Sequence, residues 1–390
     1  MSEQAIADYR RFSAVMLALV AGQCGLHACM AGMRVALPLQ ALGQEASKLA
    51  LGVLVSCFAV FPAITALRFG IFTDRHGYRR PATIAALLSA CGALTAFGAT
   101  SLWQMFLAAG FCGTGAGFGM IAIQRTASRQ PLSREERLQV FSMVALAPAL
   151  GGLVGPIATG RMIDLWGYGV AYLALGLLPI ASMLIALAVR VEGGGERATA
   201  SPRSARSSFG LFGIVPLRRV MLLNLLVVAS WDLHGFALPI LGHERGFSAT
   251  EIGSIFAAFG GASLLVRGVM PFVAKRISQQ HLPLLAMVVL LVVFAAYPLL
   301  NSPWMMLVAS GLFGVVVGIT QPTIMVLLQE AAPADRCGEA LAMRSMCNQA
   351  SITILPLLYG VFGVVVGIAS MFWLMALLLF GGVVTALKLR

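Results

Sequence analysis

Polar and ionisable side chains stand inside several long apolar runs of this sequence, where each costs free energy unless it has a partner or a task. Gln23, His27 and Arg34 share the first of these runs. At about 100° per residue they project from a helix at about 0°, 40° and 20°, so they lie on one face. Such a stripe favours contact with a solute over contact with lipid. The alternative is packing against polar groups of neighbouring helices.

Asp232 is the carboxylate that falls deep inside an apolar run. A carboxylate in this setting needs a cation or a proton to offset its charge. We predict that Asp232 pairs with Arg34 in at least one conformation. Two uses follow: the pair latches an outer gate, or protonation of Asp232 releases the pair and couples the protein to protons. His234 is close in sequence but points elsewhere on a helix.

A second polar face is expected late in the chain. Arg344, Asn348 and Ser351 follow one another at i, i+4 and i+7, and Gln321 stands beside a proline in the preceding run. Arg344 falls near the inner end of its run, where it serves an inner gate or binds a lipid headgroup.

Six of these residues are predicted to line a solute cavity: Gln23, His27, Arg34, Asp232, Gln321 and Asn348. Three arginines within apolar runs against one acid favour an anionic or zwitterionic solute over a cation. The third of these arginines, Arg267, is expected to reach the inner surface with its charged end.

The composition indicates which kind of fold positions these polar side chains. The chain has 390 residues, of which 59% are hydrophobic and 11% charged, against about 25% charged residues in a soluble protein. A lipid bilayer is the solvent that tolerates such a surface. The net charge of +12 lies in short loops between apolar runs, which fits membrane topology rather than nucleic-acid binding. The seven cysteines form no CxxC pair, so we expect no disulfide framework, metal site or cofactor.

Runs of roughly 20 apolar residues are long enough to span a membrane as helices. We predict an all-α membrane protein with twelve such spans. Most of the Lys and Arg residues fall in the N-terminus, the C-terminus and every second loop, so both termini are expected in the cytoplasm of a bacterial-type inner membrane. The predicted spans are 12–37, 49–70, 81–100, 102–124, 139–160, 169–190, 219–241, 251–274, 281–300, 303–327, 339–360 and 366–387.

The two halves of the chain repeat each other at a constant offset of 201 residues. Leu37-Pro38 matches Leu238-Pro239, and Trp103 matches Trp304. A basic stretch rich in Gly and Ser separates the halves and reads as a flexible linker. We predict a six-helix bundle over 1–190, a cytoplasmic linker over 191–218 and a second six-helix bundle over 219–390, with the two repeats in parallel orientation.

The loop after the second span reads GIFTDRHGYRR and resembles the signature of the major facilitator superfamily. Tyr78 replaces the first basic residue of its final cluster, and in the second half Lys275 and Arg276 stand where the motif would repeat without its acid. The resemblance implies a gate that closes the cytoplasmic side, with Asp74 meeting the start of the eleventh span. The alternative is a charged turn that only sets topology. The matching residues are Gly70, Asp74, Arg75, Gly77, Arg79 and Arg80.

The fifth span reads GGLVGPIATG and resembles a motif of exporters in this family, where it accompanies proton-driven efflux. Gly151, Gly155, Pro156 and Gly160 match, and Thr159 replaces one glycine. The alternative is ordinary close packing of small residues. One departure weakens the link to protons, because Phe111 stands where the exporters carry an arginine in the fourth span.

These observations predict a secondary transporter that moves a small solute by alternating access, with proton-coupled efflux as the favoured mode. The expected partners are a small-molecule solute, protons and the lipid bilayer, and we expect a monomer. Uptake of a small organic anion is the main rival. A membrane sensor that does not transport is a rival from another class, but no extra signalling domain is visible. The sequence shows no paired catalytic groups and no phosphate-binding loop, so we do not expect an enzyme.

Overall fold

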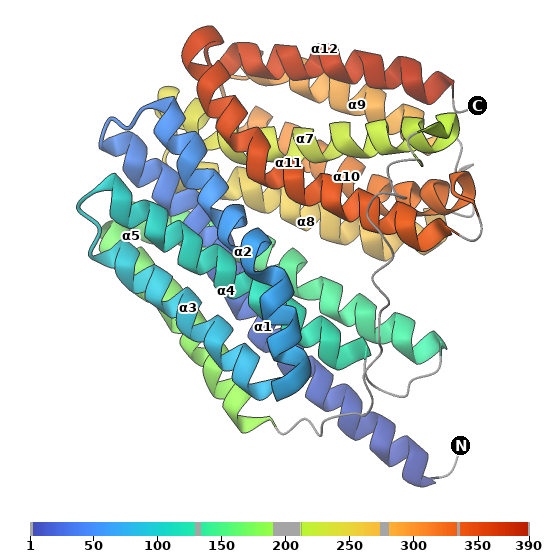
Figure 1. The fold of residues 1–390 in the computed structure, drawn as a ribbon. Helices are drawn as coiled ribbons and strands as arrows, with labels where there is room; N and C mark the ends of the chain where they lie inside the picture. Colours follow the sequence, from blue (N-terminus) through green and yellow to red (C-terminus); the bar gives the residue numbers. More distant parts are fainter. Residues whose placement is uncertain are drawn as a thin grey trace. The chain divides into compact units, whose positions relative to one another are not determined.

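The computed structural model describes residues 3–128, 134–189, 211, 213–273, 281–333 and 336–388. This part of the chain is α-helical apart from short turns and contains no strand (Figure 1). Most of the predicted linker, with Lys275 and Arg276, lies outside the described residues.

Five helical elements make up the first half of the chain. They are α1 (Glu3–Gly43), α2 (Lys48–His76), α3 (Arg79–Phe97), α4 (Leu102–Ser128) and α5 (Arg134–Ala188). The second half contains α7 (Val215–Glu244), α8 (Ala249–Val273), α9 (Leu282–Ala296), the 3-10 turn η2 (Tyr297–Leu299), α10 (Pro303–Ala331), α11 (Cys337–Val366) and α12 (Ile368–Leu387).

Eleven of the described helices are long and apolar enough to cross a membrane. One of them, Val140–Ala188, has 49 residues, about twice what a span needs. Gly167 interrupts it with a φ of 82°, so two helices meet there. This break falls between the predicted spans 139–160 and 169–190, and the eleven helices therefore account for the twelve predicted crossings. Gly367, with a φ of 80°, separates α11 from α12 in the same way.

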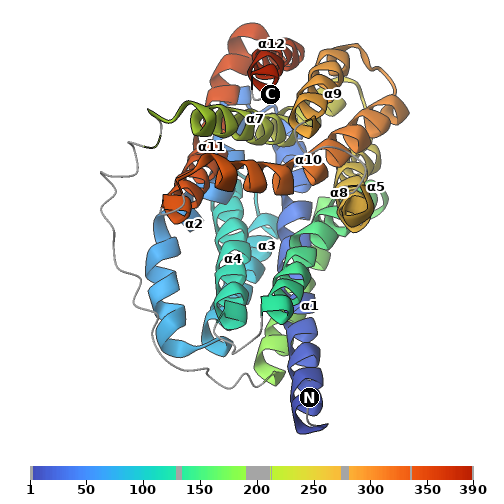
Figure 2. The same ribbon diagram turned by 90° about the vertical axis from the view of Figure 1, so that its right-hand side faces the viewer.

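The helices form two compact units. The N-terminal unit comprises Met1–Gln44 and Cys57–Ala198, and the C-terminal unit comprises Glu45–Ser56 and Thr199–Arg390. Within the N-terminal unit α1 packs on α5 and α4, and α3 runs beside α4 (Figure 2). Within the C-terminal unit α8 packs on α10, α9 on α12, and α7 on α11, as Figure 1 shows for α9 and α12.

Glycines set the distance between helices at equivalent places in the two units. A Cβ atom on Gly113 would lie 2.0 Å from the carbonyl oxygen of Phe58, so α4 and α2 touch backbone to backbone. A Cβ atom on Gly314 would lie 2.2 Å from the carbonyl oxygen of Phe259. Both residues of the second contact follow those of the first by 201 positions. The internal repeat is therefore present in the packing of each unit.

The turn after the first helix of each half also repeats. Glu45 has a φ of 57° and Gly246 a φ of 73°, again 201 positions apart. The following helix begins in both halves at a serine, because Ser47 accepts a hydrogen bond from Ala50 N and Ser248 accepts one from Glu251 N, each at 3.2 Å. These serines occupy helix N-caps and satisfy a backbone donor that the helix cannot.

Candidate functional site

Gln23 and His27 hold each other in the core of the N-terminal unit. Gln23 Nε2 donates to the carbonyl oxygen of Ala116 on α4 at 3.0 Å and lies 2.9 Å from His27 Nδ1. Gly119 makes room for this amide, since a Cβ there would lie 2.3 Å from Gln23 Oε1. Gln23 is 2% exposed. Its described partners lie on α1 and α4, which fits the packing alternative for this part of the polar stripe.

Arg34 lies on the same helix, two to three turns further along. Its Cζ atom stands 5.4 Å from the centre of the Phe58 ring, within range of a cation–π interaction. Asp232 belongs to the other unit. The Arg34–Asp232 pair would join the two units and stays a prediction.

The glycines of the α5 motif pack against α1. A Cβ on Gly151 would lie 2.7 Å from Ala28 N, and one on Gly155 would lie 2.4 Å from the Ala28 carbonyl oxygen. Pro156 stands inside the helix and Gly160 is buried. The motif therefore brings two backbones into contact, as small residues do in membrane helix pairs.

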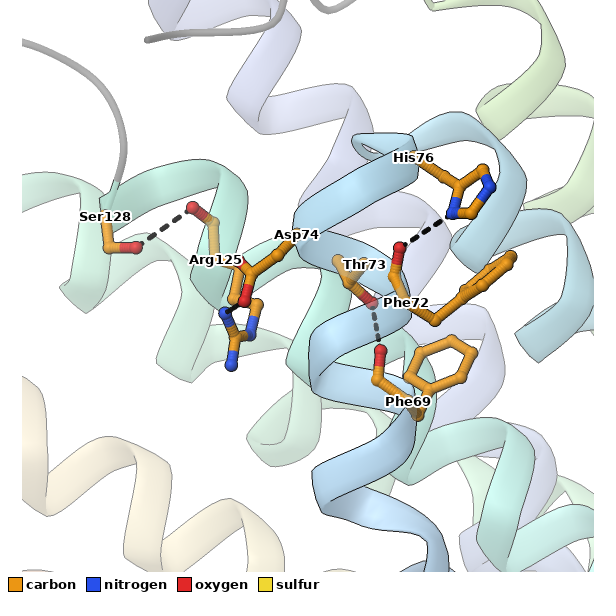
Figure 3. A network of polar contacts seen from close by, with 7 residues as sticks. All are labelled: Phe69, Phe72, Thr73, Asp74, His76, Arg125 and Ser128. Carbon is orange, nitrogen blue, oxygen red and sulfur yellow. Dashed lines mark hydrogen bonds and ion pairs between the residues drawn. The ribbon is translucent and has the colours of Figure 1, made fainter. Parts of the chain in front are cut away.

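The Gly70–Arg80 motif joins α2 to α3 and contacts α4 (Figure 3). Arg125 Nη1, from the last turn of α4, donates to Asp74 Oδ2 in an ion pair. A Cβ on Gly70 would lie 2.9 Å from Arg125 Nη2, so Gly70 leaves space for the guanidinium. Gly77 turns the chain with a φ of 70°. The motif thus ties the ends of α2 and α4 together within one unit.

The remaining basic residues of the motif point outward. Arg75, Arg79 and Arg80 are exposed, whereas Tyr78 is buried. Tyr78 belongs to an apolar cluster that includes Met16 and Ala122. Burial raises the pKa of its hydroxyl above the usual value, so the side chain stays neutral. The predicted approach of Asp74 to α11 concerns both units and stays a prediction.

The C-terminal unit gathers several of the predicted polar residues around Arg344. Its Nε donates to Asn224 Oδ1 at 2.8 Å and its Nη2 to Gln321 Oε1 at 2.6 Å. Asn224 Nδ2 in turn donates to Asn348 Oδ1 at 2.7 Å. Nη1 lies 3.2 Å from Met325 Sδ. Three helices, α7, α10 and α11, therefore supply one cluster, which we call the Arg344 cluster.

Asp232 lies in the interior of α7, two turns from Asn224. Ser351 Oγ on α11 donates to Asp232 Oδ2 at 2.9 Å. Tyr359 OH donates to the carbonyl oxygen of Ala229 at 3.0 Å, next to this contact. The α7–α11 seam thus carries Arg344 and Asp232 at different depths along the same pair of helices.

His234 occupies a separate place in the same unit. Its Nε2 lies 3.1 Å from both Tyr297 OH and Ser310 Oγ. Phe256 meets the ring edge-on, and Phe313 packs against it at a tilt. The side chain is 2% exposed. His234 therefore ties α7 to α10 and η2 rather than contacting the Asp232–Ser351 pair.

Two residues of these contacts were not singled out by the sequence. Asn224 joins Arg344 to Asn348, and Arg125 is the partner of Asp74. The repeat offset would have found Asn224, because it stands 201 positions after Gln23. Among the described residues no group of three or more His, Cys, Asp or Glu side chains is placed to hold a metal ion.

Two curated bacterial proteins resemble the chain over most of its length. "Inner membrane transport protein YajR" of Escherichia coli (strain K12) is 25% identical over 331 residues, which cover 80% of this chain and 68% of that protein. "Uncharacterized MFS-type transporter YuxJ" of Bacillus subtilis (strain 168) is 24% identical over 339 residues, covering 80% and 81%.

Solved structures share the fold at low sequence identity. The nucleoside transporter NupG superposes with a TM-score of 0.76 at 13% identity, covering 96% of this chain and 99% of that one. A bacterial homologue of the human lysosomal transporter Spinster gives 0.70 at 14% identity, covering 98% and 95%. The family model of the Major Facilitator Superfamily matches residues 19–231 and 220–390. With eleven described helices long and apolar enough to cross a membrane, an internal repeat and this match, the chain belongs to the major facilitator superfamily of secondary transporters.

Proposed function

We propose that this transporter exports a small solute in exchange for protons, by alternating access. The observation that carries the proposal is Asp232, a carboxylate inside α7 that accepts a hydrogen bond from Ser351. A serine hydroxyl can donate to a carboxylate and can accept from a carboxylic acid. This contact therefore suits both protonation states, as a proton carrier requires.

The favoured direction rests on the α5 motif. Its residues resemble those of exporters, and Gly151 and Gly155 support close contact with α1. Phe111 in place of the exporters' arginine means that proton coupling has to use another group, and Asp232 is our candidate. We further propose a monomer in a bacterial-type inner membrane with both termini in the cytoplasm.

Inside-out vesicles with an imposed proton gradient test this function. Drugs, siderophores and organic acids are added in turn, and proton efflux from the vesicles is followed with a pH-sensitive dye. We expect a transported solute to release protons from wild-type vesicles and not from Asp232→Asn vesicles. Glu244→Gln, at the end of the same helix, is the matched control and should behave as wild type. Unchanged proton release in Asp232→Asn would rule out Asp232 as the coupling group.

Uptake of a small organic anion is the second candidate. It is favoured by Arg344, which has amide partners and no described acid within ion-pair distance. Right-side-out vesicles separate the two directions, because an uptake carrier accumulates the anion under an inward proton gradient and an exporter does not.

A further inference from the structure

We propose that the Arg344 cluster binds an oxyanion, a carboxylate or phosphate group, inside the C-terminal unit. The proposal uses only α7, α10 and α11 of that unit. If the oxyanion belongs to a transported solute, the proposal rests on the proposed function and adds the charge of that solute. If the oxyanion belongs to a lipid headgroup, the proposal is independent of that function.

The guanidinium of Arg344 is held in a fixed plane. Nε and Nη2 bond to amide oxygens on α7 and α10, at 2.8 Å and 2.6 Å. Asn224 is fully buried, and its own amide nitrogen is bound to Asn348, which fixes the direction of the oxygen it offers. A planar donor fixed on two sides loses little freedom when a ligand arrives, which favours binding.

The Arg344 guanidinium has more N–H donors than it has acceptors among the described residues. A guanidinium has five N–H donors. One goes to Asn224, one to Gln321 and one points to the sulfur of Met325, which is a weak acceptor. Two further donors of Arg344 have no acceptor in the described part of the chain. Two donors on one guanidinium match the two oxygens of a carboxylate or phosphate.

Among the residues that the structure describes, Arg344 also has no acidic partner. All its described partners are neutral, and no Asp or Glu of the described ranges stands within ion-pair distance. A half-buried cation surrounded by amides attracts an anion, because bringing one in offsets the cost of burying the charge. Arg125 at the end of α4 differs in this respect, because Asp74 supplies its counter-charge within the protein.

Purified protein in neutral detergent, stripped of lipid, provides the test. Its melting temperature is measured with benzoate, salicylate, succinate and phenylphosphonate, and with benzylamine and phenethylamine as cationic counterparts. Arg344→Gln removes the charge, Arg344→Lys keeps the charge but loses the fork of donors, and Arg267→Gln is the control. Arg267 is another arginine within a helix of this unit, on α8.

We expect at least one anion and none of the amines to raise the melting temperature. The shift should vanish in Arg344→Gln, fall by at least half in Arg344→Lys and persist in Arg267→Gln. A shift with amines only, an anion shift that survives in Arg344→Gln, or no shift with any anion would overturn the proposal.

A second arm separates the two sources of an oxyanion. Phosphatidylglycerol is added back to the stripped protein before the anions. If the lipid raises the melting temperature through Arg344 and the free anions then add nothing, the ligand is a headgroup; if the free anions act with lipid present, the ligand is a solute. Failure of proton-coupled transport with intact anion binding would reject the proposed function alone, and loss of binding with intact transport would reject this site alone.

Discussion

The two halves of this transporter share a backbone and differ in what they do with one buried amide. In the N-terminal unit Gln23 donates a hydrogen bond to a backbone carbonyl, and Gly119 leaves space for its amide. In the C-terminal unit Asn224, its counterpart in the repeat, supports Arg344. The glycine contacts that set helix distances recur in both units, whereas the polar partners do not. The repeat therefore preserves the scaffold, while the partners of the equivalent amides Gln23 and Asn224 differ between the halves.

The two arginines Arg125 and Arg344 sharpen this contrast. Arg125 has a carboxylate partner, Asp74 of the Gly70–Arg80 motif, and their ion pair ties α4 to α2. Arg344 has amide partners and keeps donors available for a ligand. Loss of the first should therefore cost structure, and loss of the second should cost binding.

The largest effect is expected where a glycine brings two backbones together. Gly113→Ala and Gly314→Ala would each place a Cβ within 2.2 Å or less of a carbonyl oxygen. Relieving such an overlap shifts whole helices and costs about 1–3 kcal/mol or more, so both variants should lose most of their folded yield in fluorescence-detected gel filtration.

Gly311→Ala is the control for this pair, because no atom lies within 4 Å of the added Cβ. It should fold as wild type. Normal yield of Gly113→Ala or Gly314→Ala would contradict the packing equivalence of the two units.

The fold was accessible from sequence because its signals are long and repeated. The length of the apolar runs predicts the membrane crossings, and the constant offset, seen for example between Trp103 and Trp304, predicts the internal repeat. The polar contacts are harder to predict from sequence. The spacing of residues gives the face of a helix on which a side chain lies, but it does not give the residue that this side chain contacts. Arg125 follows the fourth predicted span directly, but only the structure shows that it meets Asp74 on α2. The two spans predicted over 139–160 and 169–190 meet at the break at Gly167.

A medium effect is expected from breaking one side of the Asp74–Arg125 pair. Arg125→Gln removes the ion pair between α4 and Asp74 and should lower stability by about 1 kcal/mol, since the pair is partly exposed. The double variant Asp74→Asn/Arg125→Gln should recover much of the loss, because neither charge remains. The measurement is the melting temperature of the three proteins, and equal melting of single and double variants would contradict the coupling.

Arg344→Gln should behave differently in the absence of ligand. Removing a half-buried charge whose partners are neutral relieves a desolvation cost, so we expect the melting temperature of the ligand-free protein to stay level or rise. A fall as large as that of Arg125→Gln would mean that Arg344 is a structural residue and would erase the contrast between the units.

The smallest effect is expected in the repeated turn. Glu45 adopts the left-handed backbone that Gly246 adopts in the other half, and a residue with a side chain pays about 1 kcal/mol there. Glu45→Gly should therefore raise stability slightly and Gly246→Ala should lower it by a similar amount. Opposite shifts of the melting temperature in the two variants support the equivalence of the turns, and equal signs contradict it.

Chemical modification of arginine tests the central contrast most directly. The protein is treated with phenylglyoxal with and without the anion that gives the largest thermal shift, and the modified arginines are mapped by peptide mass spectrometry. The account predicts that the anion protects Arg344 and leaves Arg125 and Arg267 unchanged. Equal modification of Arg344 with and without the anion, or protection at Arg125 instead, would contradict it.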